Sequence, residues 1–317
     1  MLSDSTHNVT GPTLSRSQQA EGVEFVALGG GHGLSTLLRG LKKYTANLTA
    51  IVTVADDGGS SGVLRREMGL LPPGDLRNCI TALAEAEPLM TRLFQYRFGQ
   101  DTGLDGHTFG NLLIAALTAV TGDFAKAIGE AGRVLAVRGR ILPSSLENVV
   151  LCAEVRSRRN LNAEPHLVCG ESAITKAGGM IERVYLQPSD ARGYPEATRA
   201  ILHADMIVAG PGSLYTSILP NLLITDISRA IKASPALKVY VCNVATQPGE
   251  TDGYDAGDHV RALREHLGSG FFDYVMINSN TSYQLPPGSG SEMVEPHFAV
   301  ADECGVVVED LVDRDLP

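Results

Sequence analysis

The stretch VEFVALGGGHGLSTLLRGL, residues 23–41, decides the fold class. An apolar run leads into a glycine cluster, and a run with helical spacing of apolar residues follows it. Glycines permit positive φ angles and let backbone N–H groups approach an anion, while the following helix adds its positive end. The stretch therefore predicts a strand, a phosphate-binding turn and a helix. The glycines of this turn are Gly29, Gly30, Gly31 and Gly33.

The composition is that of a folded protein without general affinity for nucleic acids. Hydrophobic residues make up 44% and charged residues 20% of the 317 residues, as in ordinary globular proteins. The formal charge is -10, whereas sequence-independent nucleic-acid binding requires a positive surface that displaces counterions. At roughly 150 residues per domain, the length accommodates two domains or one large α/β unit.

Cysteine spacing and the absence of long apolar runs favour a reduced, cytoplasmic protein. The five cysteines are odd in number and show no CxxC or Cys/His metal spacing. No apolar run reaches the roughly 20 residues that span a bilayer, so we expect no membrane span. Residues 1–22 lack the apolar centre of a signal peptide and offer little to bury, which predicts a disordered tail.

Apolar runs alternate with helical segments, which is the pattern of a parallel sheet covered by helices on both faces. Candidate strands are residues 23–28, 49–54, 149–155, 206–210, 239–244 and 274–280, with a late strand at 306–312. Most are apolar almost throughout, as strands buried on both faces require. We predict a doubly wound, mostly parallel α/β fold. A helical insertion at about 76–137 and a strand-rich segment at 140–188 add a helical layer and an extra β segment.

Four polar, glycine-rich loops follow predicted strands. Besides GGGHG they are DDGGSSG at 56–62, GPGSLYTSILPN at 210–221 and NVATQPGETDG at 243–253. In open α/β sheets, ligands bind beyond the carboxyl ends of the strands where the strand order reverses, so we expect the four loops to meet at one site. Ligand-binding candidates in the last two loops are Gly210, Pro211, Gly212, Ser213, Thr216, Ser217, Asn221, Asn243, Gln247, Thr251 and Asp252.

NAD is the first alternative for the ligand, and the glycine turn argues against it. The dinucleotide fingerprint G-x-G-x-x-G is broken in both registers, by Leu34 or by Thr36. Asp56 does lie about where such folds place the acid that binds the ribose. Asp57 and a glycine–serine turn follow it at once. Adjacent carboxylates with small hydroxyl residues suit Mg²⁺ held through water, a sugar diol or an acid–base pair, and a polar turn with a serine N-cap is the simpler alternative.

Further candidates lie at two predicted helix starts. In PPGDLRN, Asp75 is a natural N-cap and Arg77 can clamp a phosphate with two hydrogen bonds. In DGHTFGNL, His107 and Asn111 are four residues apart, so both can reach one side of the helix start; without another carboxylate or histidine at helical spacing they do not predict a zinc site. The remaining ligand-binding candidates are His32, which serves equally well as a helix cap, Ser60, Ser61 and Asn78.

Six ordered motifs resemble those of a known family. ALGGGHGLSTLLRGL, VTVADDGGSSGVLR, PPGDLRN, HTFGNLL, PGSLYTSILPNLL and CNVATQPGETDGY are similar to the gluconeogenesis-factor (YvcK) branch of the 2-phospho-L-lactate transferase (CofD)-like proteins. The resemblance covers about residues 23–312. It implies a Rossmann-like fold in a single domain over residues 23–317. One departure is His32, which stands where the family pattern leads us to expect Thr.

The two branches of this family imply different functions. Transferase members move a phospholactyl group from a guanosine nucleotide to a deazaflavin hydroxyl with Mg²⁺. The branch resembled here binds UDP-sugars, such as UDP-N-acetylglucosamine and UDP-glucose, and supports cell shape and cell-wall synthesis during gluconeogenic growth. We therefore expect a UDP-sugar rather than NAD, no required cofactor, cell-envelope synthesis proteins as candidate partners, and a homodimer as the default assembly.

The expected role is binding rather than catalysis. The alternative is a Mg²⁺-dependent transferase of phosphorus-containing groups, in which Asp56 and Asp57 are the catalytic and metal-binding candidates. In the preferred arrangement the diphosphate lies on Gly30–Gly33 and the uridine near Gly210–Asn221. The sugar then faces Asp56, Asp57 and His107.

Overall fold

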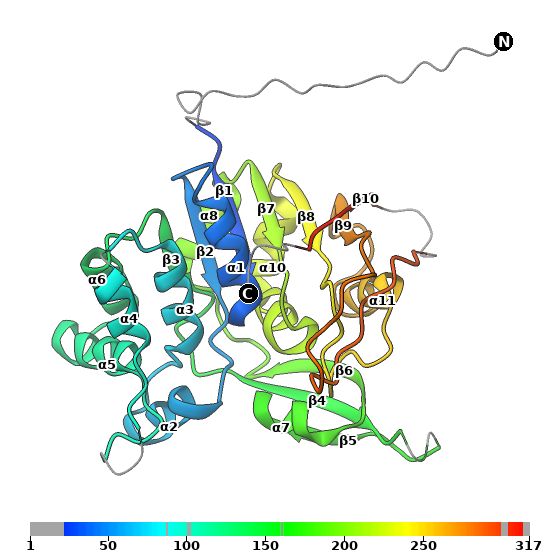
Figure 1. Cartoon of the computed structure of the whole chain (residues 1–317), viewed down its shortest axis with the longest axis horizontal. Helices are drawn as coiled ribbons and strands as arrows, with labels where there is room; N and C mark the ends of the chain where they lie inside the picture. Colours follow the sequence, from blue (N-terminus) through cyan, green and yellow to red (C-terminus); the bar gives the residue numbers. More distant parts are fainter. Residues whose placement is uncertain are drawn as a thin grey trace.

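The computed structural model describes residues 22–312 except 87, 100–102, 159, 161 and 299–303. The predicted tail, apart from residue 22, therefore lies outside the described residues. The described part of the chain is built around one large parallel sheet, and a second, smaller sheet packs beside it (Figure 1).

The large sheet reverses its strand order between β1 and β7. Within the described residues its order is β10-β9-β8-β7-β1-β2-β3, and all pairs are parallel. The chain winds outward from β1 to β3, returns to pair β7 with β1, and continues to β10. The predicted doubly wound α/β fold is confirmed. The strands are β1 (Phe25–Gly29), β2 (Leu48–Val52), β3 (Arg140–Pro143), β7 (Met206–Ala209), β8 (Leu237–Val241), β9 (Tyr274–Asn278) and β10 (Gly305–Glu309).

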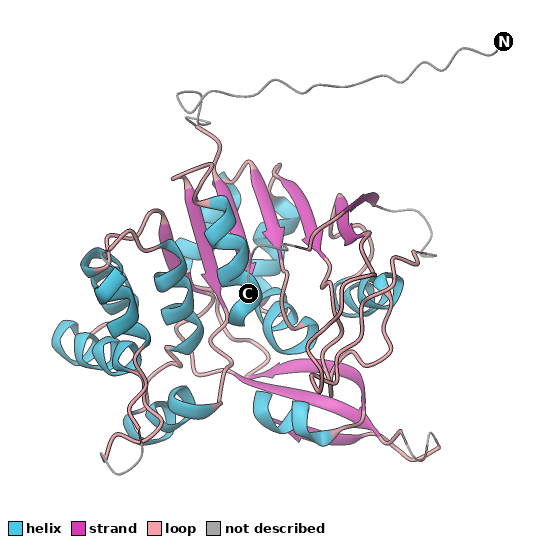
Figure 2. Cartoon of the chain, in the orientation of Figure 1, coloured by secondary structure: helices cyan, strands magenta, loops and turns pink. Residues whose placement is uncertain are grey.

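Helices flank the large sheet (Figure 2). After α1 (Gly31–Leu41), the segment between β2 and β3 forms α2 (Gly59–Met68), α3 (Gly74–Leu83), α4 (Pro88–Gln95), α5 (Phe109–Thr121) and α6 (Phe124–Val134). The later helices are α8 (Pro195–His203), the π-helix η2 (Leu214–Ile218), α9 (Leu219–Leu222), α10 (Thr225–Ala233) and α11 (Ala256–Leu267). The inserted helical layer begins at Gly59 rather than near residue 76, because the DDGGSSG turn itself opens a helix. None of the described helices has the length and apolarity to cross a bilayer.

The core lies between the large sheet and its helices. Residues Val26–Leu28 of β1 and Ala50–Val52 of β2 are buried on both faces of the sheet. Leu34 and Leu38 lie one turn apart on α1 and are fully buried, so that α1 packs its apolar face inward. Each such side chain contributes about 1.5–3 kcal/mol of transfer free energy. This packing fixes the start of α1 at the carboxyl end of β1.

The small sheet is antiparallel and corrects one strand prediction. It consists of β4 (Val150–Arg156), β5 (His166–Cys169) and β6 (Met180–Gln187) in the order β5-β4-β6, with α7 (Glu171–Ala177) between β5 and β6. The assignment of residues 149–155 to the parallel sheet is wrong: the strand is central in the small sheet, and its buried residues Leu151–Ala153 imitate the apolar run of a parallel strand, although Glu154 is exposed. Figure 1 shows the small sheet and α7 at the carboxyl ends of the large sheet's strands.

A disulfide in the small sheet corrects the expectation that all cysteines are reduced. Cys152 and Cys169 stand directly opposite each other in the β4–β5 ladder and are bonded, with their Cα atoms 4.0 Å apart. The sequence spacing of 17 residues gives no hint of this pairing, because only the antiparallel register creates it. Cys79, Cys242 and Cys304 are not in disulfides.

Candidate ligand-binding cleft

A cleft of about 720 Å³ opens at the carboxyl ends of β1, β2, β7 and β8. It includes the point between β1 and β7 where the strand order reverses, which is where open α/β sheets bind ligands. Its volume lies within the roughly 300–1,000 Å³ typical of small-molecule sites. The four glycine-rich loops meet here, as the sequence predicts.

Many of the predicted ligand-binding residues line this cleft. They are Gly30, Gly31, His32, Gly33, Asp56, Asp75, Asn78, Pro211, Gly212, Ser213, Ser217, Asn243 and Gln247. Several other lining residues are not predicted from the sequence, namely Thr36, Glu171, Val244, Ala245, Thr246 and Leu311. Thr36 and Thr246 stand inside the glycine-rich stretches 23–41 and 243–253. Glu171 and Leu311 come from distant parts of the chain without a local motif.

The loops that form the cleft interlock through a close backbone approach and side-chain hydrogen bonds. A side chain at Gly33 would place its Cβ 2.7 Å from the carbonyl carbon of Pro211 and still closer to the carbonyl oxygen. Gly212 donates its N–H to Asn243 Oδ1 at 2.9 Å. Gln247 donates from Nε2 to Ser213 Oγ at 2.5 Å. The loops after β1, β7 and β8 therefore form one connected wall.

Asp75 lies at the positive end of α1 rather than capping its own helix. The N-cap of α3 is Pro73, so the N-cap prediction for Asp75 is wrong. A Cβ at Gly30 would lie 2.5 Å from Asp75 Oδ2, and Asp75 accepts the N–H of Gly31. Burial, together with the charge of Asp56, raises the pKa of Asp75 to about 6. Asp75 is therefore an ionisable group at the place where the sequence predicts a phosphate.

Glu171 brings a protonated carboxyl into the same cleft. It begins α7 and reaches the cleft from the small sheet. Burial raises its pKa to about 9, and the negative charges of Asp56, Asp75 and Glu250 act in the same direction. Burial also raises the pKa of Asp56 against the hydrogen bonds from Gly58 and Ser61. At neutral pH the Glu171 carboxyl is neutral, so it can donate a hydrogen bond to a ligand oxygen.

Asp57, the neighbour of Asp56, points out of the cleft. Its Oδ1 accepts the N–H of Ser172 at 2.9 Å, and its Oδ2 lies directly against Gly170. It lines a separate pocket of about 340 Å³ together with Arg65 and Arg66. The two adjacent aspartates therefore serve different parts of the molecule: Asp56 faces the cleft, and Asp57 holds the start of α7.

The carboxylates do not form a metal site on their own. Among the described residues, no group of three or more His, Cys, Asp or Glu is arranged to hold a metal ion. Asp56 Oδ1 accepts the N–H of Gly58 at 2.8 Å, and Asp57 is bound to Ser172. The described residues therefore offer no all-protein Mg²⁺ site, and a Mg²⁺ ion in the cleft would depend on substrate phosphates with Asp56 as a carboxylate ligand.

Another group of predicted residues forms a network next to the cleft. Ser60 Oγ lies 3.0 Å from His107 Nδ1 and accepts the Nδ2–H of Asn111 at 3.0 Å. This network joins α2 to α5.

Other predicted residues make contacts at the start of α3. Ser61 accepts the N–H of Gly74, and Arg77 donates to Asn78 Oδ1 at 2.9 Å. None of these residues apart from Asn78 lines the cleft.

The remaining predicted residues position the loops. Asn221, fully buried, donates to the carbonyl oxygens of Gly29 and Ser217. Thr216 donates to Glu250 Oε1 at 3.0 Å, and Gly210 adopts a φ of 84° directly before Pro211.

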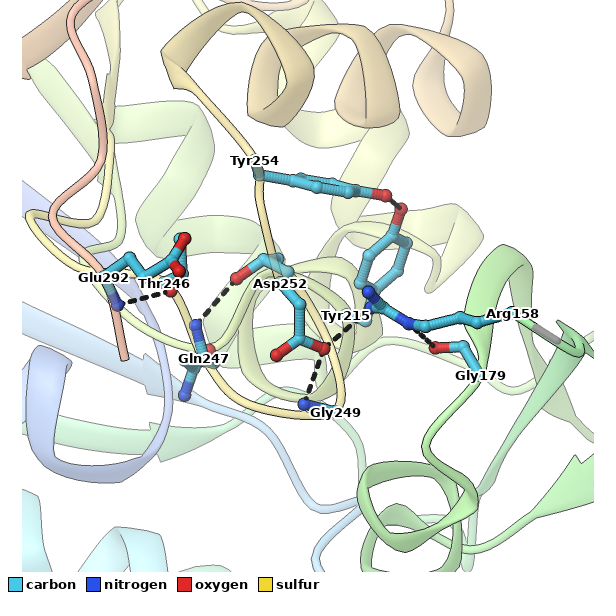
Figure 3. A network of polar contacts seen from close by, with 10 residues as sticks. Arg158, Gly179, Tyr215, Thr246, Gln247, Gly249, Asp252, Tyr254 and Glu292 are labelled. Carbon is cyan, nitrogen blue, oxygen red and sulfur yellow. Dashed lines mark hydrogen bonds and ion pairs between the residues drawn. The ribbon is translucent and has the colours of Figure 1, made fainter. Parts of the chain in front are cut away.

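A polar network within the β8–α11 loop, and between this loop and neighbouring elements, holds the loop in place (Figure 3). Thr251 accepts the N–H of Gln247 at 2.9 Å. Asp252 accepts from Gly249 and pairs with Arg158 at 2.7 Å, which ties the loop to the small sheet. Tyr215 and Tyr254 join their hydroxyls at 2.9 Å. Thr251 and Asp252 therefore shape the loop and do not line the cleft.

Comparison with known proteins places this fold and cleft in a family. The model of the family described as "2-phospho-L-lactate transferase CofD" matches residues 25–312, so the chain belongs to the CofD family. The gluconeogenesis factor of Halalkalibacterium halodurans is 54% identical over 253 residues, which is 80% of this chain and 76% of that protein. The gluconeogenesis factor of Bacillus subtilis is 53% identical over 256 residues, which is 81% of this chain and 78% of that protein. Within the family, the chain is therefore similar to the gluconeogenesis factors, as its motifs predict.

Two further comparisons bear on length and fold. A relative from Nostoc sp. is 52% identical over 269 residues, which is 84% of this chain and 58% of the Nostoc protein, so the chain spans little more than half of that relative. A crystal structure of a Bacillus halodurans protein superposes with a TM-score of 0.84 at 46% identity, covering 92% of this chain and 94% of the other. A second structure, of a member of the UPF0052 family from the same organism, gives a TM-score of 0.83. These matches agree with the α/β fold described above.

Proposed function

We propose that the protein binds a UDP-sugar, such as UDP-N-acetylglucosamine or UDP-glucose, in the cleft between β1 and β7. The observation that carries this proposal is the meeting of the four glycine-rich loops around one cleft at the reversal of strand order. Such a site offers backbone N–H groups and a helix N-terminus for phosphates, with hydroxyl and amide side chains for sugar and base. The bound state then regulates cell shape and cell-wall synthesis during gluconeogenic growth, a role that the family relationship supports.

The same geometry disfavours NAD. In a dinucleotide-binding fold the acid that binds the ribose stands at the end of the second strand. Here β2 ends at Val52, and Asp56 lies four residues further along the chain. The close approach of Gly33 to Pro211 also explains why glycine is needed there without any dinucleotide. The incomplete glycine fingerprint and the position of Asp56 beyond the end of β2 both argue against NAD as the ligand.

The arrangement of the ligand follows from the lining residues. The diphosphate lies near the start of α1 beside His32, and the uridine lies near the β7–η2 loop and Asn243. The sugar hydroxyls face Asp56, as in the sequence-based arrangement, and Glu171, which takes the place of Asp57 and His107 because those two residues do not line the cleft. A neutral Glu171 donates to a sugar or phosphate oxygen.

Isothermal titration calorimetry with UDP-N-acetylglucosamine, UDP-glucose, GDP and NADH tests the proposal. We expect saturable binding of the UDP-sugars and weaker or no binding of NADH. Replacing Gln247, which lines the cleft, with Ala should weaken UDP-sugar binding. Thr251 lies outside the cleft and accepts the N–H of Gln247, so the Thr251→Val variant shows how much binding depends on the position of this loop. A preference for NADH, or no binding of any UDP-sugar, would sink the proposal.

A transferase acting on a nucleotide-activated substrate is the second candidate. It is favoured by the three cleft carboxyls whose pKa values are raised, Asp56, Asp75 and Glu171, since such groups gather at sites of proton transfer. Incubation with UDP-N-acetylglucosamine, Mg²⁺ and glycerol as a hydroxyl acceptor should then release UMP if the sugar phosphate passes to the acceptor oxygen, or UDP if the sugar alone does, with the hydroxyl proton taken up by a cleft carboxylate. Loss of this release in Asp56→Asn, with nucleotide binding retained, would favour catalysis; no release from the unaltered protein would contradict transfer from this donor to this acceptor.

A further inference from the structure

The disulfide of the small sheet lies directly next to a segment that enters the cleft. Cys152 is on the central strand β4 and is fully buried, whereas Cys169 ends the edge strand β5 and is exposed. Thiol–disulfide exchange requires that a thiolate reach one of the two sulfurs. Only the Cys169 side of this bond is open to an external thiol.

Three consecutive residues connect this bond to the cleft. Gly170 follows Cys169 with a φ of 101°, and its N–H donates to Leu151 O at 2.8 Å. Glu171 comes next and lines the cleft. Ser172 then donates its N–H to Asp57 Oδ1 at 2.9 Å. A shift of Cys169 therefore reaches Glu171 within two residues.

The strand that carries Cys169 is held mainly from one side. β5 is four residues long, stands at the edge of the small sheet and, among the described residues, pairs with β4 alone. Reduction removes the covalent link between Cys152 and Cys169, so β5 is then held by its backbone ladder with β4 and can shift more freely. On α7, a longer contact between Thr175 and Glu250 at 3.5 Å opposes this movement.

We propose that Cys152 and Cys169 form a reversible redox-modification site that accepts a dithiol reductant, and that its oxidised state holds Glu171 in the cleft. Reduction lets the β5–α7 junction move, and this movement weakens the hydrogen bond between Ser172 and Asp57. The part of the proposal that concerns ligand affinity rests on the proposed UDP-sugar function. The movement of the junction does not depend on it.

The exchange proceeds in two steps. A thiolate of the dithiol attacks Sγ of Cys169, the S–S bond breaks, and Cys152 leaves as a thiolate that takes up a proton. The second thiol of the reductant, as its thiolate, then attacks the mixed disulfide and releases Cys169 as a thiolate, which is also protonated. The dithiol loses two electrons and becomes a cyclic disulfide, and the protein gains two thiols. A disulfide of the same chemical class reverses both steps.

Hydrogen exchange measured by mass spectrometry on the full chain, without ligand, tests the movement. The oxidised protein is compared with the protein reduced by dithiothreitol. We expect faster exchange in the peptide that contains residues 170–177 after reduction, and no change in α1. Cys169→Ser should exchange like the reduced protein under both conditions, and Cys304→Ser should respond like the unaltered protein.

Calorimetric titration of UDP-N-acetylglucosamine into the same samples tests the consequence for the ligand. Loss of one positioned hydrogen bond should weaken binding on the order of three- to tenfold in the reduced protein. Equal exchange of residues 170–177 in both states, or a bond that dithiothreitol cannot reduce in the folded protein, contradicts the redox proposal. No UDP-N-acetylglucosamine binding in either state overturns the proposed function, while the exchange result still decides the redox proposal.

Discussion

Two regions build the cleft, and the sequence encodes them differently. The loops after β1 and β7 meet in a close backbone approach of Gly33 to Pro211, and the N–H of Gly212 joins the loop after β7 to the Asn243 side chain after β8. The β5–α7 junction instead delivers one side chain, Glu171, from a separate antiparallel sheet. The first region is visible as glycine-rich motifs because close backbone approach excludes side chains. The second leaves no motif because a single carboxylate can come from any surface helix.

The adjacent aspartates illustrate this difference. Asp56 lines the cleft with the interlocked loops, and Asp57 binds the N–H of Ser172 in the junction. One dipeptide thus joins the two regions. Because the two residues are adjacent in sequence, a shared catalytic role is the natural expectation. In the structure, however, Asp56 faces the cleft and Asp57 faces the start of α7.

The largest effect should come from breaking the interlocked loops with Gly33→Ala. The added Cβ would meet backbone atoms of Pro211 and Gly212, which cannot rotate away. We expect UDP-sugar binding to be lost and the free energy of unfolding to fall by about 3 kcal/mol, the upper end for overpacking. Chemical denaturation and calorimetry measure the two quantities. Gly40→Ala in the same helix is the control, because no atom lies within 4 Å of its Cβ, and stability should stay equal or rise. Equal behaviour of the two variants would refute the interlocking.

The next largest effect should come from the junction, with Glu171→Gln. Since burial raises the pKa of Glu171 to about 9, the folded protein holds a proton that the unfolded chain loses near pH 4.5. Stability associated with this group is therefore full below pH 4.5 and declines as the pH rises toward 9. The isosteric variant does not titrate, so its free energy of unfolding should exceed that of the unaltered protein by an amount that grows as the pH rises from 4.5 toward 9.

Thermal unfolding of the unaltered protein and Glu171→Gln at pH 5 and pH 8 measures this effect. The difference between the two proteins should grow with pH. Glu67→Gln, at an exposed position of α2, is the matched control and should show no such growth. A difference that is the same at both pH values would show that Glu171 is ionised in the folded protein.

The Asp75→Asn variant should show whether the ligand phosphates lie at the N-terminus of α1, and its effect should be smaller than that of Glu171→Gln. Because the pKa of Asp75 is raised to about 6, its carboxylate becomes charged between pH 5 and 7.5 and then repels a nearby diphosphate. Affinity for UDP-N-acetylglucosamine should fall about tenfold over this range in the unaltered protein, which corresponds to roughly one pKa unit of coupling, and should stay level in the variant. Titrations in a His32→Gln background separate this effect from the imidazole. A parallel pH dependence in both proteins would place the phosphates elsewhere.

The smallest effect should come from Asp252→Asn. Asp252 lies outside the cleft and forms a partly exposed pair with Arg158, so its replacement should cost about 0–1 kcal/mol of stability. UDP-sugar affinity should change by less than about twofold, since a partly exposed ion pair contributes too little free energy to control the position of the loop. A large loss of affinity without a loss of stability would instead show that Asp252 contacts the ligand, as the sequence of its loop predicts.

The sequence predicts the large sheet and the cleft well because both follow from local patterns. Continuous apolar runs mark the strands that are buried on both faces, and the glycine-rich loops mark their carboxyl ends. Residues 149–155 mislead the same reasoning, because the central strand of the small antiparallel sheet also carries a buried apolar run, Leu151–Ala153, beside its exposed Glu154. The short strand β3 has only four residues and was not distinguished within the strand-rich segment 140–188.

The roles of single polar residues are less predictable. Asn221 and Thr251 stand in loops of the right composition, yet both bind backbone groups of their own loops or of β1. Asp75 caps no helix of its own and reaches the start of α1. Glu171 and the disulfide between Cys152 and Cys169 arise from the pairing of distant strands. Such contacts depend on tertiary geometry, which spacing within a motif does not contain.

The central claim is that the interlocked loops and Glu171 face one UDP-sugar. A crystal structure of the protein with UDP-N-acetylglucosamine tests it most directly. The account predicts the diphosphate beside His32 at the start of α1 and a sugar oxygen within hydrogen-bond distance of Glu171, with Asp57 still bound to Ser172. A ligand in contact with Asp57 in the neighbouring pocket, and an empty cleft between β1 and β7, would contradict it.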